Sequence, residues 1–279
     1  MAIPTLDFNG STPVVTIPQG FQVSKFFKLE KKYHFKLNNL LQDGDGNTKL
    51  RKNKKRGFQT VGLNLAPAKL AMVGNTCPSS TKGCRESCLD NCGLRAVFES
   101  IHLGKIARTV LWFKDRKRFL EMLDDELERK RYSAERAGFR LAGRLNVFSD
   151  IPFEKHGVMD RHPAIEFYDY TKRFKRFGQL RPNYWVTLSR SENNEAQCLW
   201  ALSQGANVAI VFGSKRGKRF TQLPKTWKGF PVVVGDESDL RFQDPRGRTR
   251  GRVVGLELKA PNNRLYQKAI DSGFAVPVA

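Results

Sequence analysis

Short apolar runs alternate with longer polar or helical stretches from residue 58 onward. The first run is FQTVGLNLAP, and six more follow it: FRLAGRLNVFSD, AIEFYDYTK, NYWVTLSRSE, ANVAIVFGSK, FPVVVGDESD and RVVGLELKA. Nearly continuous apolar runs of this length are typical of strands that are buried on both faces of a sheet. Residues 94–137 predict two helices, with Gly138 closing the second, and ENNEAQCLWALSQG predicts a crossover helix between two strands.

Strands that alternate with crossover connections favour a parallel sheet. We therefore predict an α/β fold whose parallel strands form a complete or partial TIM-like barrel, with a basic N-terminal extension. The expected parts are a basic arm or hairpin region over residues 1–57, a barrel-like α/β domain with a cysteine cluster over 58–260, and a C-terminal tail over 261–279 packed on that domain. A chain of 279 residues can bury a core of that size.

Polar residues follow the apolar part of the predicted strands, at their carboxyl ends. Because these ends form the active face of parallel α/β folds, we expect the polar side chains to lie near one site. Candidates for general acid, base or nucleophile are Asp150, Asp169, Lys172, Asp236 and Asp239. Candidates for cofactor binding are Asn64, Asn146, Ser189, Arg190 and Glu192. The alternative for any single Asp is a helix cap or a turn.

Four of the five cysteines lie within sixteen positions, as Cys77, Cys84, Cys88 and Cys92. They directly follow the first strand of the alternating region, so they are expected at the same carboxyl edge. Thiolates at this spacing suit an iron–sulfur cluster, or alternatively a four-cysteine zinc site. A third interpretation is structural, because the last three cysteines are spaced i, i+4 and i+8 and could pack as one face of a helix. Cys198, within AQCLWAL, is expected to be a packing residue.

The charge balance indicates a polyanionic partner. The chain has 49 Lys and Arg against 27 Asp and Glu, a formal net charge of +22. Such a surplus attracts nucleic acid, and we expect DNA rather than RNA. A membrane surface is the competing partner, but the sequence has no basic amphipathic helix with a broad apolar face. The candidate phosphate-binding residues are Lys49, Arg51, Lys52, Lys54, Lys55, Arg56, Lys215, Arg216, Lys218 and Arg219. Solvated basic loops are the alternative for the same residues.

Other sequence signals narrow the functional class. The N-terminal residues lack the basic start, apolar core and cleavage site of a secretory signal, and no run reaches the roughly 18 apolar residues of a membrane span, so we expect a cytoplasmic protein. Neither a P-loop nor a dinucleotide-binding glycine motif is present. His156 and His162 follow the SDIPFE strand end and could approach the site, although packing or surface roles are the usual ones. The residues do not determine the oligomeric state.

A set of ordered segments resembles a known family. These are VGLNLAPAKLAMVGNTCPSSTKGCRESCL, ARTVLWFKDRKRFL, RLNVFSDIPFE, FYDYTK, SRSENNEA, VAIVF and VVVGDESDLRFQDPRG. Together they resemble the bacteriophage "gene-product-88" domain family from about residue 58 to 260. The resemblance implies that Cys77, Cys84 and Cys88 belong to the family pattern, and it leaves a fourth ligand open.

A more distant likeness is to radical S-adenosylmethionine enzymes, which place a three-cysteine iron–sulfur loop directly after the first strand of a partial α/β barrel. Their spacing is C-x3-C-x2-C, whereas this chain has C-x6-C-x3-C. With three thiolate ligands, one iron would stay open for S-adenosylmethionine. If Cys92 also binds, the cluster is closed and structural.

These observations predict a phage-type enzyme that modifies DNA or RNA with a cysteine-ligated iron–sulfur cluster and, in the sharper form, radical S-adenosylmethionine chemistry. Two alternatives stay open. One is a zinc-stabilised nucleic-acid-binding protein without catalytic activity. The other is a metal-independent base-exchange enzyme with an aspartate nucleophile.

Overall fold

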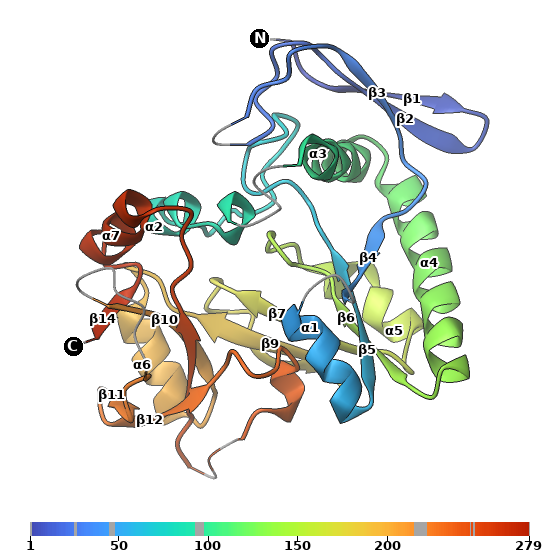
Figure 1. Cartoon of the computed structure of the whole chain (residues 1–279). Helices are drawn as coiled ribbons and strands as arrows, with labels where there is room; N and C mark the ends of the chain where they lie inside the picture. The colour runs from blue at the N-terminus through green and yellow to red at the C-terminus, as the bar shows by residue number, and fades with distance from the viewer. Residues whose placement is uncertain are drawn as a thin grey trace.

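The structure is a computed structural model of the whole chain (Figure 1). It describes residues 2–24, 27–44, 48–92, 98–214, 222–245, 247 and 249–278. The two helices predicted within residues 94–137 are present as α3 (Glu99–Lys114) and α4 (Arg116–Arg136). They separate at Asp115, whose carboxylate caps α4 by accepting a hydrogen bond of 3.0 Å from the Arg118 backbone nitrogen.

A central sheet of eleven strands organises the described part of the chain, in the spatial order β11-β12-β13-β10-β9-β7-β6-β5-β4. Neighbours from β5 to β12 along this path are parallel, and β4 and β11 add antiparallel edges. β8 pairs with β9, and β14 pairs with β10. The strand bounds are β4 (Leu41–Asp43), β5 (Phe58–Leu63), β6 (Arg140–Arg144), β7 (Glu166–Thr171), β8 (Gly178–Arg181), β9 (Tyr184–Ser189), β10 (Val208–Ser214), β11 (Thr226–Trp227), β12 (Phe230–Val234), β13 (Val253–Glu257) and β14 (Val276–Val278).

The sheet is mixed and mostly parallel, as predicted for the α/β class, but it does not close into a barrel within the described ranges. Its path ends at β4 on one side and β11 on the other. The strand order also turns back, because β13 lies beside β10 and β12 lies outside it. Short antiparallel strands at both ends are typical of the protected edges of an open sheet.

Residues 1–57 do not form an extension separate from the fold. β1 (Thr5–Asn9), β2 (Thr12–Ile17) and β3 (Tyr33–Lys36) form an antiparallel sheet that contacts α3. In β2 the alternating residues Val15 and Ile17 are fully buried in the same core as α3. β4 then joins the central sheet. The predicted hairpin at KKYHFKL is therefore part of a three-stranded sheet (Figure 1).

The two faces of the central sheet are covered differently. One face packs against α4, with Leu123 and Leu127 beside Leu141 of β6 in the main core. On the other face, Leu240 packs with Phe58 and other apolar side chains of the sheet. The remaining helical segments are α1 (Thr48–Arg51), η2 (Lys52–Arg56), α2 (Lys82–Glu86), η3 (Leu89–Asn91), η5 (Phe153–His156), α5 (Val158–Arg161), α6 (Glu195–Ser203), η6 (Arg241–Gln243) and α7 (Asn263–Asp271). Of these, α6 is the predicted crossover helix, and it buries Cys198 completely.

Candidate functional site at the carboxyl edge of the sheet

The cysteine-rich segment runs across the carboxyl edge of the parallel strands. Near its start, the Cys77 thiol donates a hydrogen bond of 3.0 Å to the Phe148 carbonyl, in the loop after β6. Further along, the Thr81 hydroxyl donates to Glu192, after β9, over 2.7 Å. At its end, the Cys92 sulfur lies 3.6 Å from the Lys259 carbonyl, after β13. The segment that carries the cysteines therefore contacts three different strand-end loops, two of them through Cys77 and Cys92.

Glu192 fixes the middle of this segment. Its two carboxylate oxygens accept hydrogen bonds of 2.7 Å from the Thr81 hydroxyl and from the Gly83 backbone nitrogen, at the start of α2. A Cβ atom at Gly83 would lie 2.8 Å from a Glu192 oxygen and 2.9 Å from the Phe274 Cβ, so a larger residue there would force these neighbours to shift. Glu192, which we predicted to bind a cofactor, anchors α2 through these two hydrogen bonds.

Cys77, Cys84 and Cys88 lie close enough for their charges to interact. Burial raises the pKa of the Cys77 thiol, and the nearby Cys84 and Asp150 raise it further. Burial also raises the pKa of the Cys88 thiol far above its ordinary value, with Asp90, Cys84 and Cys77 contributing. The Cys77 and Cys88 thiols are therefore protonated at neutral pH in the metal-free protein.

The thiol and carboxylate side chains at this edge are possible metal ligands, but they do not converge on one point in the described part of the chain. Across the described ranges, no three His, Cys, Asp or Glu side chains are placed so that they could hold a metal ion. The interpretation of the cysteines as one face of a helix is wrong, because α2 ends at Glu86, and Cys88 and Cys92 flank the separate segment η3. A metal would require the thiols to lose their protons and to turn toward a common point.

Asp169 is held in a buried polar network. It is fully buried, and it accepts hydrogen bonds from the Asn146 backbone nitrogen (2.8 Å), the Asn146 side chain (3.0 Å) and the Tyr184 hydroxyl (2.9 Å). Burial raises its pKa to about 6, against the opposing effects of Arg176 and Asn146. Its three donors occupy the carboxylate, so Asp169 positions Asn146 and is closed to substrate.

Arg176 is the centre of this network, and the sequence did not identify it because it lies within the ordinary-looking basic stretch TKRFKRFG. Its side chain is buried and donates to Asp150 (2.8 Å), to Glu154 (2.7 and 2.9 Å) and to the Tyr184 hydroxyl (2.7 Å). Asp150 also accepts from the Thr171 hydroxyl at 2.9 Å. The predicted Asp150 carboxylate is thus near Cys77 and neutralised by Arg176.

Lys172 and two predicted cofactor residues form a second set of contacts at the same edge. The Lys172 ammonium donates to the Ser189 hydroxyl (3.1 Å) and to the Arg190 carbonyl (3.3 Å). Arg190 donates to the Gly273 carbonyl (2.6 Å) and pairs with Glu195 (3.0 Å). Arg190 therefore joins β9 to the C-terminal segment, while Lys172 keeps a half-exposed position at the edge.

Asp239 lies on the opposite face of the sheet from Asp169, so the structure does not bring these two predicted residues together. It pairs with Arg144 at 2.9 Å and lies 3.3 Å and 3.4 Å from the hydroxyls of Tyr168 and Tyr170. Side chains alternate between faces along a strand, so Asp169, between these two tyrosines, points the other way.

Two further predicted residues contact neighbouring strands. Asp236 follows β12 and accepts from the Glu257 backbone nitrogen of β13 at 2.8 Å. Asn64, directly after β5, is buried and donates to Gln42 of β4. Both lie at strand ends, as predicted, and these hydrogen bonds tie their strands to the adjacent ones.

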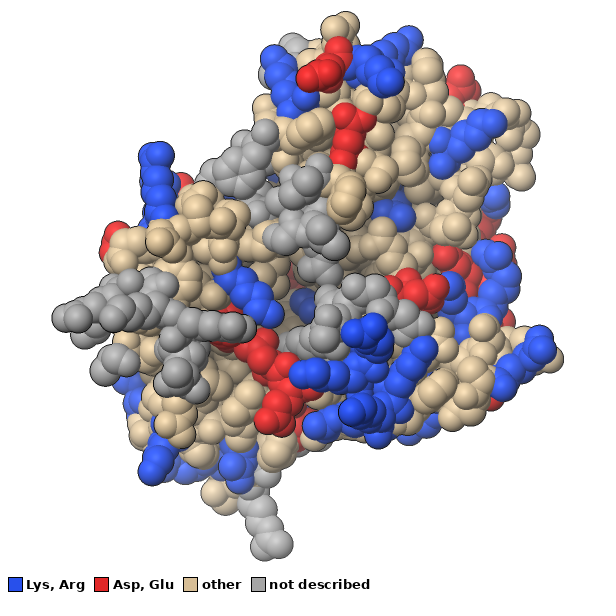
Figure 2. All heavy atoms as spheres, in the orientation of Figure 1, with Lys and Arg blue, Asp and Glu red and all other residues tan. Residues whose placement is uncertain are grey.

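The basic residues of α1 and η2 lie at the other end of β5. Arg51, Lys52, Lys55 and Arg56 are exposed just before the strand begins, and Lys54 packs over the Phe139 ring at 5.7 Å. Figure 2 shows Lys and Arg side chains gathered over the position of α1. The side chain of Lys49 and the residues Lys215, Arg216, Lys218 and Arg219 lie outside what the structure describes.

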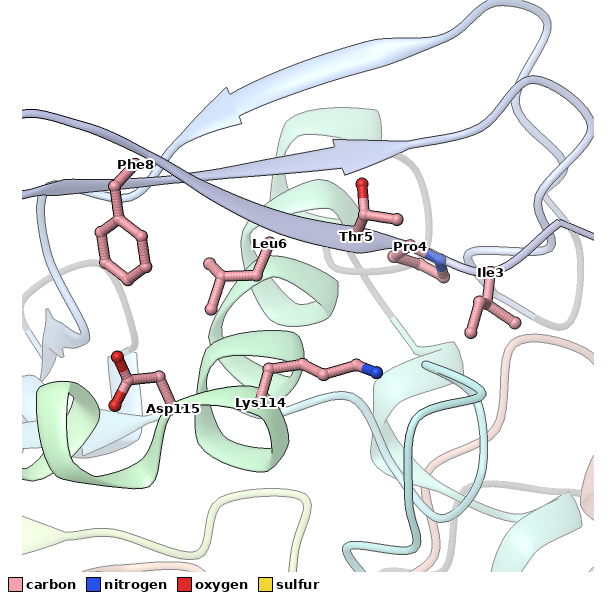
Figure 3. A pocket seen from close by; sticks show the side chains of 7 residues that line it. All are labelled: Ile3, Pro4, Thr5, Leu6, Phe8, Lys114 and Asp115. Atoms are coloured by element: carbon pink, nitrogen blue, oxygen red, sulfur yellow. The ribbon is translucent and has the colours of Figure 1, made fainter.

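One surface hollow lies away from these residues. It has a volume of about 400 Å³, between β1 and the end of α3, and is lined by Ile3, Leu6 and Phe8 together with Lys114 and Asp115 (Figure 3). None of the predicted site residues lines it. Another hollow, of about 230 Å³, includes Asp150 and adjoins the cysteine segment at Asn75 and Pro78.

These features define a mixed α/β protein with an open, mostly parallel sheet and a cysteine-rich segment across its carboxyl edge. The family model "Gene product 88" matches residues 38–277, and the chain belongs to this bacteriophage family. Comparisons with curated proteins and with solved structures gave no match. The family region begins twenty residues before the boundary expected at residue 58, and so it includes β4, α1 and η2. In the described part of the chain, no helix combines the length and the apolar character needed to cross a membrane.

Proposed function

We propose that this protein modifies nucleic acid, DNA in preference to RNA, with its chemistry centred on the carboxyl edge of the sheet. In this proposal Cys77, Cys84 and Cys88 are the ligands of an iron–sulfur cluster. The observation that carries it is the grouping of these three thiols, whose charges interact with each other, beside Asp150 at that edge. The net charge of +22 supports a polyanionic substrate.

The proposed ligand set contains three cysteines, the three that the family resemblance implies. The Cys92 sulfur lies 3.6 Å from the Lys259 carbonyl, at the end of the cysteine-rich segment. Three thiolates leave one iron of a four-iron cluster without a protein ligand. When bound, such a cluster supplies one-electron chemistry, and S-adenosylmethionine is the co-substrate that the distant likeness to radical enzymes suggests.

The protein's own residues hold the loop that carries this site. Asp169 binds Asn146, and the Asn146 side chain in turn contacts Ser149 (2.8 Å) and the Ile151 backbone (2.7 and 2.9 Å). These bonds fix the loop whose Phe148 carbonyl accepts from Cys77. The buried network therefore positions the first cysteine, a role that argues against Asp169 as the nucleophile of a base-exchange reaction.

Anaerobic purification followed by quantitation of iron, sulfide and zinc tests the proposal. We expect iron with sulfide, lost in Cys84→Ala and retained in Cys92→Ala and in Cys198→Ala, the matched cysteine controls. Isothermal titration with S-adenosylmethionine then tests the open coordination position. Zinc that is lost in both Cys84→Ala and Cys92→Ala would instead establish the zinc-stabilised binding protein. Absence of any metal would overturn the proposal.

A further inference from the structure

A hollow beside the candidate site combines cationic and aromatic side chains. It has a volume of about 230 Å³, and its lining includes Asn75, Trp112, Arg116, Asp150, His156 and Arg173. The residues come from four segments: the cysteine-rich loop, the junction of α3 and α4, the loop and turn after β6, and the loop after β7. The hollow therefore lies where these elements meet at the carboxyl edge.

Its two guanidinium groups are available for a ligand. Arg116 stacks over the Trp112 ring at 4.7 Å, and burial, together with the Arg116 charge, lowers the pKa of the neighbouring His156. The Arg173 backbone nitrogen donates to Thr171, and its guanidinium has no carboxylate partner among the described residues. Most other arginines near the site are paired, as Arg176 and Arg190 are with acidic side chains.

The acidic group in the hollow does not offset these cations. Asp150 is already paired with Arg176 at 2.8 Å, and it also accepts from the Thr171 hydroxyl and from the Lys172 backbone nitrogen. His156 adds a third nitrogen-bearing side chain, packed edge-on against Trp112 with ring centroids 5.3 Å apart. The hollow is therefore a cationic recess with an aromatic wall.

The size and chemistry of the recess fit one small anionic group. Its volume of about 230 Å³ is below that of typical small-molecule pockets, roughly 300–1,000 Å³. Arginine binds phosphate with two parallel hydrogen bonds, and an aromatic ring behind the guanidinium restricts its orientation. These properties match the phosphate of a nucleotide unit.

We propose that this recess, formed by Arg116, Arg173 and His156, binds a single backbone phosphate of the nucleic acid. The inference rests on the proposed function for the identity of the polymer. Binding of the phosphate in the recess places the nucleic-acid strand against Asn75 and Pro78, and thus next to Cys77. The recess then fixes the position of the nucleic acid along its own length. The distant basic residues of α1 and η2 increase the affinity but do not fix that position.

Binding of a fluorescent single-stranded oligonucleotide at several salt concentrations tests this inference. The double variant Arg116→Ala/Arg173→Ala should bind more weakly and reduce the salt slope by about one, the value for a single phosphate that is no longer neutralised. The matched control Lys114→Ala/Lys117→Ala removes the same charge from exposed positions beside the hollow and should retain the slope. Arg116→Lys should recover only part of the affinity, because lysine cannot make the bidentate contact.

Direct observation of the recess separates phosphate binding from general electrostatics. Titration of inorganic phosphate should shift the imidazole resonances of His156 in the wild type and in the lysine control, but not in the double arginine variant. Equal binding of a nucleoside monophosphate and of the oligonucleotide would overturn the backbone assignment in favour of a free nucleotide. Unchanged His156 resonances would overturn the site itself. Neither readout depends on bound metal, so each can fail independently of the iron–sulfur proposal.

Discussion

Asp169 on β7 and Asn146 in the loop after β6 are joined by two hydrogen bonds, 2.8 Å from the Asn146 backbone nitrogen and 3.0 Å from its side-chain nitrogen. Through Asn146 this buried carboxylate holds the loop that contacts Cys77. The most deeply buried of the predicted catalytic aspartates thus has a positioning role. Its effect on the site is transmitted by the backbone of one loop.

Replacing Asp169 with Asn should change how stability depends on pH. Burial raises the pKa of Asp169 from the ordinary 3.8 to about 6, so between these values the folded protein holds a proton that the unfolded chain releases. This contribution to stability is complete below pH about 4 and is lost as the pH rises through about 6. Relative to that of Asp169→Asn, the free energy of unfolding of the wild type should fall by about 3 kcal/mol over this range. Urea unfolding at pH 4 to 7 measures the difference.

Asp160→Asn is the control for that experiment, because Asp160 is exposed and pairs with Arg181 at the surface. Because ion pairs at the surface contribute little, the free energy of unfolding of Asp160→Asn should stay within about 1 kcal/mol of the wild type over the same pH range. A constant difference for Asp169→Asn would show that Asp169 is ionised in the folded protein throughout.

Arg176→Ala should be strongly destabilising. The change leaves Asp150 and Glu154 buried without their shared cation, and breaking a buried pair typically costs about 3–5 kcal/mol. Arg181→Ala removes an exposed pair with Asp160 and should cost less than about 1 kcal/mol. Chemical denaturation at neutral pH compares the two. A similar loss of unfolding free energy in Arg176→Ala and Arg181→Ala would mean that solvent reaches the Arg176 network.

The sequence predicted the parallel α/β sheet because its buried strands are apolar nearly throughout, and it located the cysteine segment because that segment directly follows such a strand. It did not predict that the sheet stays open. Barrel closure depends on which strand pairs at each edge, and the return of the chain from β12 to β13 leaves no local pattern.

The sequence predicted only part of the candidate site, because contacts between distant segments leave no local pattern. A polar residue at a strand end indicates the edge but not the face, and Tyr168, Asp169 and Tyr170 show that neighbouring positions reach different networks. Arg176 was not predicted because a buried arginine and a solvated one have the same sequence neighbours. Only the folded arrangement of Asp150, Glu154 and Tyr184 distinguishes them.

Gly83→Ala should disrupt the cysteine segment more than the rest of the fold. The added Cβ would meet Glu192 and Phe274 at 2.8–2.9 Å, and relief of such overpacking typically costs about 1–3 kcal/mol. Because Glu192 anchors the start of α2 there, Cys84 should shift and metal content after anaerobic purification should fall. Lys82→Ala, at an exposed position of the same helix, is the control and should retain metal. Full metal content in Gly83→Ala would show that α2 tolerates displacement from Glu192.

The exposed basic residues before β5 should strengthen nucleic-acid binding without setting its position. Removing one side chain that neutralises a phosphate reduces the slope of log K against log salt by about 0.7–0.9, so Lys55→Ala/Arg56→Ala should reduce it by up to about two. Arg129→Ala/Arg136→Ala removes the same charge from exposed positions on α4 and provides the control. Anisotropy titrations with one oligonucleotide at several salt concentrations measure both. Equal slopes for the two double variants would remove this surface from the binding model, because net charge alone would then account for the affinity.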